Sequence, residues 1–146
     1  MGKKYDPAMH TAEHILNQTM DHMFGCGRSF NAHIEKKKSK CDYRFDRPLA
    51  AAEIAAIEAA VNGIIRSNLP VTDRLVARST AEQQYHTGKL PPDAGDSIRI
   101  VRIGDYDACP CIGLHVRRTS DIPGFRILSA SHENGVLRIR FALRSE

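Results

Sequence analysis

Residues 10–27 read HTAEHILNQTMDHMFGCG, and they predict the long helix that opens the fold. Asp6 is placed to cap its first turn, and Pro7 suits the first helical position, where a missing N–H costs nothing. Gly25 and Gly27 end the helical pattern. We therefore expect one long helix before the first turn of the chain.

The two sides of this helix differ in character. At about 100° per residue, His10 and His14 lie one turn apart on the same side, together with Asn17 and Asp21. The apolar residues gather on roughly the opposite side. We expect the apolar side to face the core, and Asn17 and Asp21 either to orient the histidines or to face solvent. The apolar side comprises Ala12, Ile15, Leu16 and Met23.

Farther along, the chain shows one more long helix and several strands. Isoleucine and valine recur at helical spacing within residues 48–68, with Pro48 near the start. Alternation of polar and apolar residues predicts strands, and HENG at 132–135 predicts a hairpin turn. We expect strands at 29–35, 41–46, 69–79, 97–104, 125–131 and 136–144, a short helix at 79–88 closed by Gly88, and an exposed loop at 89–96.

Helix and strand patterns that are partly segregated along a chain favour an α+β fold. We therefore predict a two-layer domain in which a mainly antiparallel sheet packs against two long helices. The chain has 146 residues, of which 42% are apolar. This size predicts a single domain over residues 1–146, with a substantial core.

Charge and cysteine content indicate the compartment and the partners. The formal net charge of +4 is mildly basic, which is weak support for a polyanionic partner. The start of the chain, MGKKYDPAM, has no apolar signal run, and no stretch is long and apolar enough for a membrane helix. We expect a soluble cytoplasmic protein without a membrane partner. Its reduced cysteines would serve as ligands or core residues: Cys26, Cys41, Cys109 and Cys111.

Two short motifs place metal-ligand residues far apart in the chain. His10 and His14 are four residues apart, so a helix places their imidazoles one above the other, as in helical zinc sites. Cys111 and His115 form a second pair with the same spacing. Either pair alone is weak, but three imidazoles and one thiolate make a suitable tetrahedral zinc set. We predict that the pairs meet, and that Cys109 is a small core residue rather than a substitute ligand or a redox partner.

The order and spacing of five segments resemble one known family. The chain carries HxxxH at 10–14, YRFD at 43–46, IEAAVNGII at 57–65, CIGLHVRRTSDIPGFRILS at 111–129 and ENGVLRIRF at 133–141. These segments resemble the editing domain shared by alanyl- and threonyl-tRNA synthetases, their second additional domain, including its free-standing AlaX-type form. The resemblance runs along nearly the whole chain.

The resemblance implies a metal-dependent aminoacyl-tRNA hydrolase that acts on the ester joining serine or glycine to an alanine tRNA. It implies a catalytic centre that binds one zinc ion per chain through His10, His14, Cys111 and His115. No module for amino-acid activation fits within 146 residues, so we expect an editing domain that acts in trans. Four protein ligands complete a tetrahedron, which is typical of structural zinc. For catalysis, the zinc would have to accept a fifth ligand, or one of the four protein ligands would have to be weakly bound.

One departure from the family pattern leaves the specificity open. Alanyl-type members usually show Cys-Gly-Gly-Thr-His, whereas this chain has Ile112 before Gly113 and Leu114 after it. Two alternatives therefore stand beside alanyl editing. The same fold could act on a different aminoacyl ester, such as a threonyl-like one. A fully ligated zinc could instead stabilise a non-catalytic module that binds RNA or protein.

Basic residues in two places are candidate tRNA contacts. A lysine cluster lies on the first hairpin, and an arginine pair follows the second metal motif. Each cation would add salt-dependent affinity for the RNA backbone. The alternatives are a solvated hairpin tip that discourages edge pairing and an ordinary strand surface. The cluster comprises Lys36, Lys37, Lys38 and Lys40, and the pair comprises Arg117 and Arg118.

Overall fold

The computed structural model describes residues 6–85 and 95–144 of the chain. Helix α1 (Pro7–Phe24) begins and ends where the sequence predicts. The Asp6 carboxylate accepts a hydrogen bond of 3.0 Å from the Met9 N–H, which satisfies one of the free donors of the first turn. At the other end, Gly25 takes a left-handed conformation with a φ of 64° and closes the helix.

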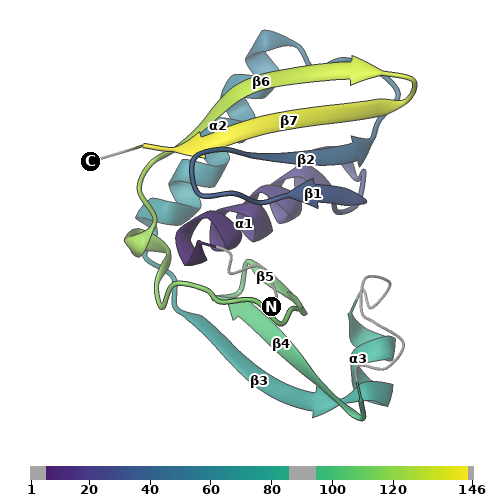
Figure 1. Cartoon of the computed structure of the whole chain (residues 1–146), viewed down its shortest axis with the longest axis vertical. Coiled ribbons are helices and arrows are strands. Elements are labelled where there is room, and N and C mark those ends of the chain that lie inside the picture. Colours follow the sequence, from purple (N-terminus) through teal and green to yellow (C-terminus); the bar gives the residue numbers. More distant parts are fainter. Residues whose placement is uncertain (1–5, 86–94, 145–146) are drawn as a thin grey trace.

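A four-stranded antiparallel sheet forms the upper layer of the molecule in Figure 1. Its strand order is β1-β2-β7-β6, so strands from both ends of the chain pair with each other. The predicted hairpin turn is confirmed, because Asn134 and Gly135 have the positive φ values, 52° and 77°, that a tight hairpin turn needs. The strands are β1 (Asn31–His33), β2 (Ser39–Arg44), β6 (Phe125–Glu133) and β7 (Val136–Leu143).

Helix α2 (Ala51–Arg66) packs on this sheet and is tied to strand β6 by side-chain hydrogen bonds. The Asn62 amide donates to the Phe125 carbonyl and accepts from the Phe125 N–H, both at 2.8 Å. The Glu58 carboxylate accepts from the Ile127 N–H at 2.7 Å. Strand β6 lies at the edge of the sheet, so these two side chains satisfy backbone groups that no further strand would pair.

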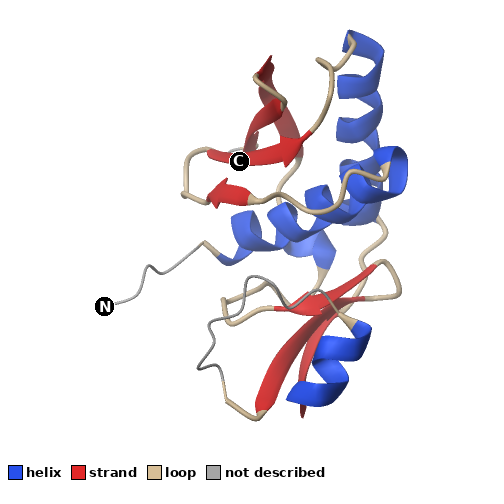
Figure 2. Ribbon diagram, turned by 90° about the vertical axis from the view of Figure 1, so that its right-hand side faces the viewer, coloured by secondary structure: helices blue, strands red, loops and turns tan. Residues whose placement is uncertain are grey.

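A second antiparallel sheet has the strand order β3-β4-β5. The predicted α+β class is confirmed, with the antiparallel strands divided between two sheets. Figures 1 and 2 both place α1 between these sheets. The remaining elements are β3 (Val71–Ala77), α3 (Arg78–Gln84), β4 (Ser97–Ile103), β5 (Asp107–Pro110) and a short 3-10 turn (Thr119–Asp121).

Three further predictions concern the loop at 89–96, membrane-spanning helices and the number of domains. Gly88 and residues 89–94 of the predicted loop lie outside the described residues. Among the described helices, none combines the length and the hydropathy needed to cross a bilayer. The organisation of residues 1–146 as a single domain stays a prediction.

Because α1 lies between the two sheets, it is buried on almost every side. Its apolar side packs into the core against the four-stranded sheet, as predicted. Met23 is the exception, because it lies near the helix end and is 40% exposed. On the polar side, Asp21 is exposed, whereas four residues are no more than 9% exposed: His10, Glu13, His14 and Asn17.

Asn17 and Asp21 act on the loop that follows α1. The Asn17 Oδ1 atom accepts hydrogen bonds from the Tyr43 hydroxyl at 2.8 Å and from the Ser29 N–H at 3.0 Å. The Asp21 carboxylate accepts from the Gly27 N–H at 2.9 Å. Of the two alternatives expected for these residues, exposure to solvent holds for Asp21, whereas Asn17 is buried and bonds to Tyr43 and Ser29. Asn17 and Asp21 fix the path of the chain from α1 to β1.

We predict that Asn17→Ala destabilises the protein by about 2–4 kcal/mol, because two buried donors lose their acceptor. Denaturant unfolding would measure the change. Tyr43→Phe is the matched control, since it removes one of the two donors without leaving a polar group unpaired, and it should cost clearly less. A loss below about 0.5 kcal/mol for Asn17→Ala, the size of an ordinary surface substitution, would contradict the assigned role.

Candidate metal centre

The four predicted ligands meet between α1 and the segment that follows β5. Helix α1 supplies His10 and His14, and the later segment supplies Cys111 and His115, with ligand atoms that all lie within 4.8 Å of one another. The Cys111 Sγ atom is 3.5 Å from Nε2 of His10 and 3.5 Å from Nε2 of His115. A tetrahedral zinc with ordinary bond lengths separates a sulfur and a nitrogen ligand by about 3.5 Å. The cluster therefore has the size that zinc needs.

Hydrogen bonds set the tautomers of two of the imidazoles. His10 Nδ1 lies 3.2 Å from the Leu114 carbonyl, which can only accept, so this nitrogen carries the proton. The Thr11 hydroxyl donates to the Pro7 carbonyl at 2.8 Å, so it accepts from His115 Nδ1 at 2.9 Å. In both rings Nε2 faces the Cys111 sulfur, and once it carries no proton it is the nitrogen that a metal ion could bind. This is the arrangement of metal-ligating histidines, whose other nitrogen is held by a fixed partner.

The third imidazole is held by the second sheet. His14 Nδ1 lies 3.1 Å from Cys109 Sγ and 3.6 Å from the Asp107 carboxylate. Asp107 is in turn bound by Arg28 at 2.8 Å, and Arg28 also reaches Cys109 Sγ at 3.5 Å. His14, Asp107 and Cys109 form a second group with ligand spacing. Because the guanidinium already balances the charge of that group, the four-residue cluster is the better candidate for a metal ion, and Asp107 is placed to orient His14.

The pKa values show how strongly the cluster favours a cation. Burial alone would raise the pKa of the Cys111 thiol, but hydrogen bonds from His10, His115 and His14 lower it to about 3. Burial alone would lower the pKa of His14, but hydrogen bonds to Asp107 and to the two cysteines raise it well above its usual value. These pKa directions favour a thiolate at Cys111 and a proton on His14 in the absence of a metal ion. A divalent ion would take the place of that proton, so metal binding releases it.

The metal-binding loop is fixed from both sides. A Cβ atom on Gly113 would lie 2.1 Å from Cε1 of His10, so only glycine fits against that ring. On the other side, the Arg99 guanidinium donates to the carbonyls of Cys111 at 3.0 Å and of Gly113 at 2.7 Å. Asp73 binds the same guanidinium at 2.6 Å. The glycine of the C-x-G-x-H motif thus lets the loop approach α1 closely enough to bring the ligands together.

Two apolar side chains of this loop face outward. Ile112 is 83% exposed and Leu114 is 60% exposed, and each is a direct neighbour of Gly113. They occupy the positions at which alanyl-type members usually show glycine and threonine. Exposed apolar residues beside a buried polar cluster are typical of a contact surface for a ligand.

Four contributors to the site were not predicted. Glu13 completes the pattern H-x-x-E-H, in which a helix places a carboxylate beside two histidine ligands, so a sequence signal did exist. Its Oε1 atom lies 3.8 Å from His14 Nε2. Thr11, Arg99 and Asp107 carry no such signal, because each acts on a residue that is distant in the chain.

The predicted tRNA contacts lie in two separate places. Lys36, Lys37 and Lys38 are exposed in the turn between β1 and β2, and Lys40 is half-buried in β2. The exposed Arg117 and Arg118 follow His115 in the chain. The Arg118 guanidinium donates to the Oδ1 atom of Asn68 at 2.8 Å and to its carbonyl at 2.7 Å, so it also anchors this segment to the end of α2. RNA contact by these residues stays a prediction.

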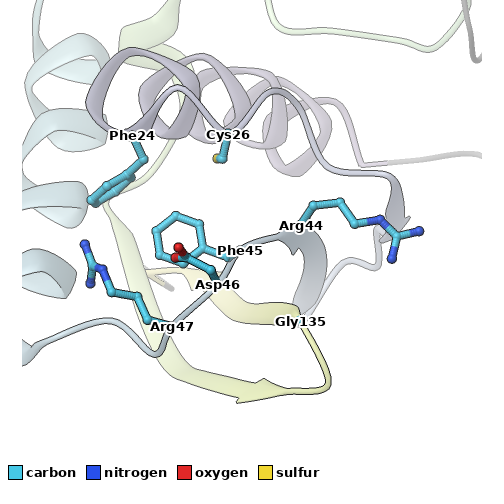
Figure 3. Close-up of a pocket in the computed structure, with 7 residues that line it drawn as sticks. All are labelled: Phe24, Cys26, Arg44, Phe45, Asp46, Arg47 and Gly135. Atoms are coloured by element: carbon cyan, nitrogen blue, oxygen red, sulfur yellow. The ribbon is translucent and has the colours of Figure 1, made fainter.

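A hollow of about 530 Å³ lies at the other end of α1 from the histidines (Figure 3). Phe24 and Phe45 meet edge to face there, with ring centroids 5.3 Å apart. The Arg47 guanidinium is engaged by the Glu53 carboxylate at 2.8 Å. This hollow is separate from the metal centre. Its lining comprises Phe24, Cys26, Arg44, Phe45, Asp46, Arg47 and Gly135.

Comparisons with known proteins point in the same direction as the motifs. Residues 98–140, which include Cys111 and His115, match the family described as the threonyl and alanyl tRNA synthetase second additional domain. The alanine–tRNA ligase of Aeropyrum pernix is 32% identical over 139 residues, which cover 90% of this chain and 15% of the ligase. The ligases of Cenarchaeum symbiosum and Methanoregula boonei are each 34% identical, over 90% and 91% of the chain. The chain spans about 15% of the length of these relatives.

We predict that Gly113→Ala weakens zinc binding by at least about tenfold, the size of effect seen when support of a ligand is lost. The added methyl group must displace the His10 ring or the loop. Competition with a chromophoric chelator would measure the affinity. Gly63→Ala is the control, because an added Cβ there meets nothing within 4 Å, and it should bind zinc like the wild type. Equal affinities for the two variants would contradict the assigned constraint.

Proposed function

Because the chain belongs to the family of alanyl-tRNA synthetase-related editing domains, we propose that it removes wrongly attached amino acids from tRNA. The reaction is hydrolysis of the ester between the amino acid and the terminal ribose. The proposed substrates are Ser-tRNA(Ala) and Gly-tRNA(Ala), on which the chain would act in trans in the cytoplasm. The observation that carries this proposal is the meeting of four ligands in one cluster: His10, His14, Cys111 and His115.

An aminoacyl ester is an activated acyl group, so its hydrolysis needs a positioned water and stabilisation of the developing oxyanion. We propose that the cluster holds one zinc ion, which when bound would supply a Lewis acid beside the ester carbonyl. The chain's own groups prepare the cluster for it. Leu114 and Thr11 hold two imidazoles with Nε2 facing the Cys111 sulfur, and Asp107 holds the third.

Glu13 is the residue to which we assign the proton transfer. Its carboxylate is almost buried and lies beside the metal-facing nitrogen of His14. The water oxygen bonds to the acyl carbon while a proton of that water passes to the Glu13 carboxylate. The bond from the acyl carbon to the ribose oxygen then breaks, and Glu13 returns the proton to that oxygen. The products are a free amino acid and a tRNA with a free terminal hydroxyl.

The exposed side chains of Ile112 and Leu114 lie at the rim of the proposed site and would affect which aminoacyl group it prefers. Both flank Gly113 on the loop that carries the ligands, so a bound ester would lie against them. An apolar edge cannot offer the hydroxyl contact that a threonine at position 114 could make with a serine substrate. A different aminoacyl preference, such as a threonyl-like one, is therefore the alternative within the same chemistry.

One observation favours a second candidate function. The cluster supplies four protein ligands, which complete the tetrahedron of a structural zinc site. In that case the metal would stabilise a module that binds RNA without hydrolysing it. The two functions differ in whether the zinc-loaded chain turns over any aminoacyl ester.

The decisive experiment measures deacylation of a small panel, Ser-, Gly- and Ala-tRNA(Ala) and Ser-tRNA(Thr), with metal content assayed on the same sample. We expect selective loss of serine or glycine from tRNA(Ala), with about one zinc per chain. Selective loss from tRNA(Thr) would support the altered specificity. A zinc-loaded chain without turnover would contradict the hydrolase proposal, and Cys111→Ala provides the metal-depleted control.

We predict that Glu13→Gln lowers the rate of hydrolysis by about 10²–10⁴-fold, the usual contribution of general acid–base catalysis. Zinc content should be unchanged, because Glu13 is not among the four assigned ligands. Single-turnover deacylation would measure the rate. Glu133→Gln, an exposed change on β6, is the matched control. Hydrolysis by Glu13→Gln at the wild-type rate would refute the proton-transfer role, and loss of zinc would show that Glu13 serves the structure of the site.

A further inference from the structure

Two like charges face each other across the centre of the four-stranded sheet. In the register between β2 and β7, Lys40 lies directly opposite Arg140. Within the described residues, neither side chain takes part in a salt bridge. The next pair on the same side of the sheet, Asp42 opposite Arg138, is neutral and forms an ion pair at 2.8 Å. Like charges directly opposite each other repel across a sheet, and the nearby Asp42 carboxylate, which attracts Lys40, is already paired with Arg138.

The pair lies in a hollow of about 210 Å³ beside the turn between β1 and β2. Three cations enter this hollow against one carboxylate, that of Glu35. The Glu35 carboxylate lies 4.0 Å from His33 Nε2, on the β1 side. The hollow is therefore positive where β2 meets β7. Its lining comprises His33, Glu35, Lys38, Ser39, Lys40 and Arg140.

The surface around the hollow is open and extends the positive charge. Figures 1 and 2 show both long helices on the other side of the four-stranded sheet, so none of the helices in residues 6–85 and 95–144 covers this side. Lys36 and Lys37 are exposed in the adjoining turn. Figure 1 places that turn at the same end of the molecule as the start of α1, from which His10 and His14 come. A chain of phosphates could therefore run from the hollow toward the metal centre.

We infer that this hollow binds a phosphodiester group of the RNA backbone, with Lys40 and Arg140 as its two contacts. The inference rests on the proposed function, which makes tRNA the substrate. A phosphate between the two cations would relieve their repulsion and form charge-assisted hydrogen bonds with both. The cations continue past the hollow along the turn, which fits a polyanion better than a single small phosphate. Release of counterions on binding would make the affinity depend steeply on salt.

The test measures the binding of a tRNA(Ala) transcript that carries no amino acid, over a series of NaCl concentrations. The double variant Lys40→Gln/Arg140→Gln should bind about tenfold more weakly at low salt, and the slope of log affinity against log salt should fall by about one to two. Arg102→Gln, an exposed change on β4 of the other sheet, is the matched control and should keep the wild-type slope. An unchanged slope in the double variant would overturn the inference.

Unfolding by denaturant separates a binding role from a structural one. Because the variant removes a repulsion, its unfolding midpoint should equal or exceed that of the wild type. A lower midpoint together with weaker binding would mean that the two cations support the fold, which would also overturn the inference.

The inference and the proposed function fail in different ways. If the wild-type chain hydrolyses the aminoacyl panel but the double variant keeps its salt slope and its KM, the phosphate site is wrong and the hydrolase stands. If the wild-type chain binds tRNA through the hollow but hydrolyses no ester, the phosphate site stands and the hydrolase is wrong.

Discussion

The contact between α1 and the segment after β5 is the constraint on which the rest of the structure depends. One side of α1 packs into the core of the four-stranded sheet, and the other side carries the polar groups that meet the second sheet. The Asp107 carboxylate and the imidazoles of His10 and His14 are buried there, beside the half-buried Cys111 and His115, and buried charges destabilise a fold unless they are balanced. Arg28 balances Asp107, and a cation among the ligands would balance Cys111. The architecture therefore brings together the residues that could hold a metal ion.

Local sequence patterns were enough to predict helix α1 and the hairpin of β6 and β7. The start and end of α1 follow from Asp6 and Gly25, and the turn between β6 and β7 follows from its Asn-Gly pair. Periodicity could not predict that the strands form two sheets. The alternating residues of β4 predict a strand, but they do not determine which strands it pairs with. The two ligand pairs were visible because each is a local motif. Thr11 and Asp107 were not, because their roles arise only when segments about a hundred residues apart meet.

The proposed hydrolysis and the proposed RNA binding take place in different parts of the molecule. The buried cluster between the sheets has few groups and fixed geometry, which suits chemistry on one bond. The open side of the four-stranded sheet carries separated cations, which suits a long and flexible polyanion. Helix α1 links the two, because it supplies His10 and His14 to the cluster and packs against the sheet that carries Lys40. A substrate with a backbone and one reactive end would use both parts at once.

The proposed metal centre uses the thiolate of Cys111 rather than that of Cys109. Cobalt titration of the metal-free chain tests it most directly, because tetrahedral Co²⁺ with a thiolate ligand has characteristic absorption whereas zinc has none. We expect one tightly bound equivalent with a thiolate-to-cobalt band that is lost in Cys111→Ser and kept in Cys109→Ser. A band that survives in Cys111→Ser and disappears in Cys109→Ser would place the metal on His14, Asp107 and Cys109 instead, and would rule out the four-residue cluster as its site.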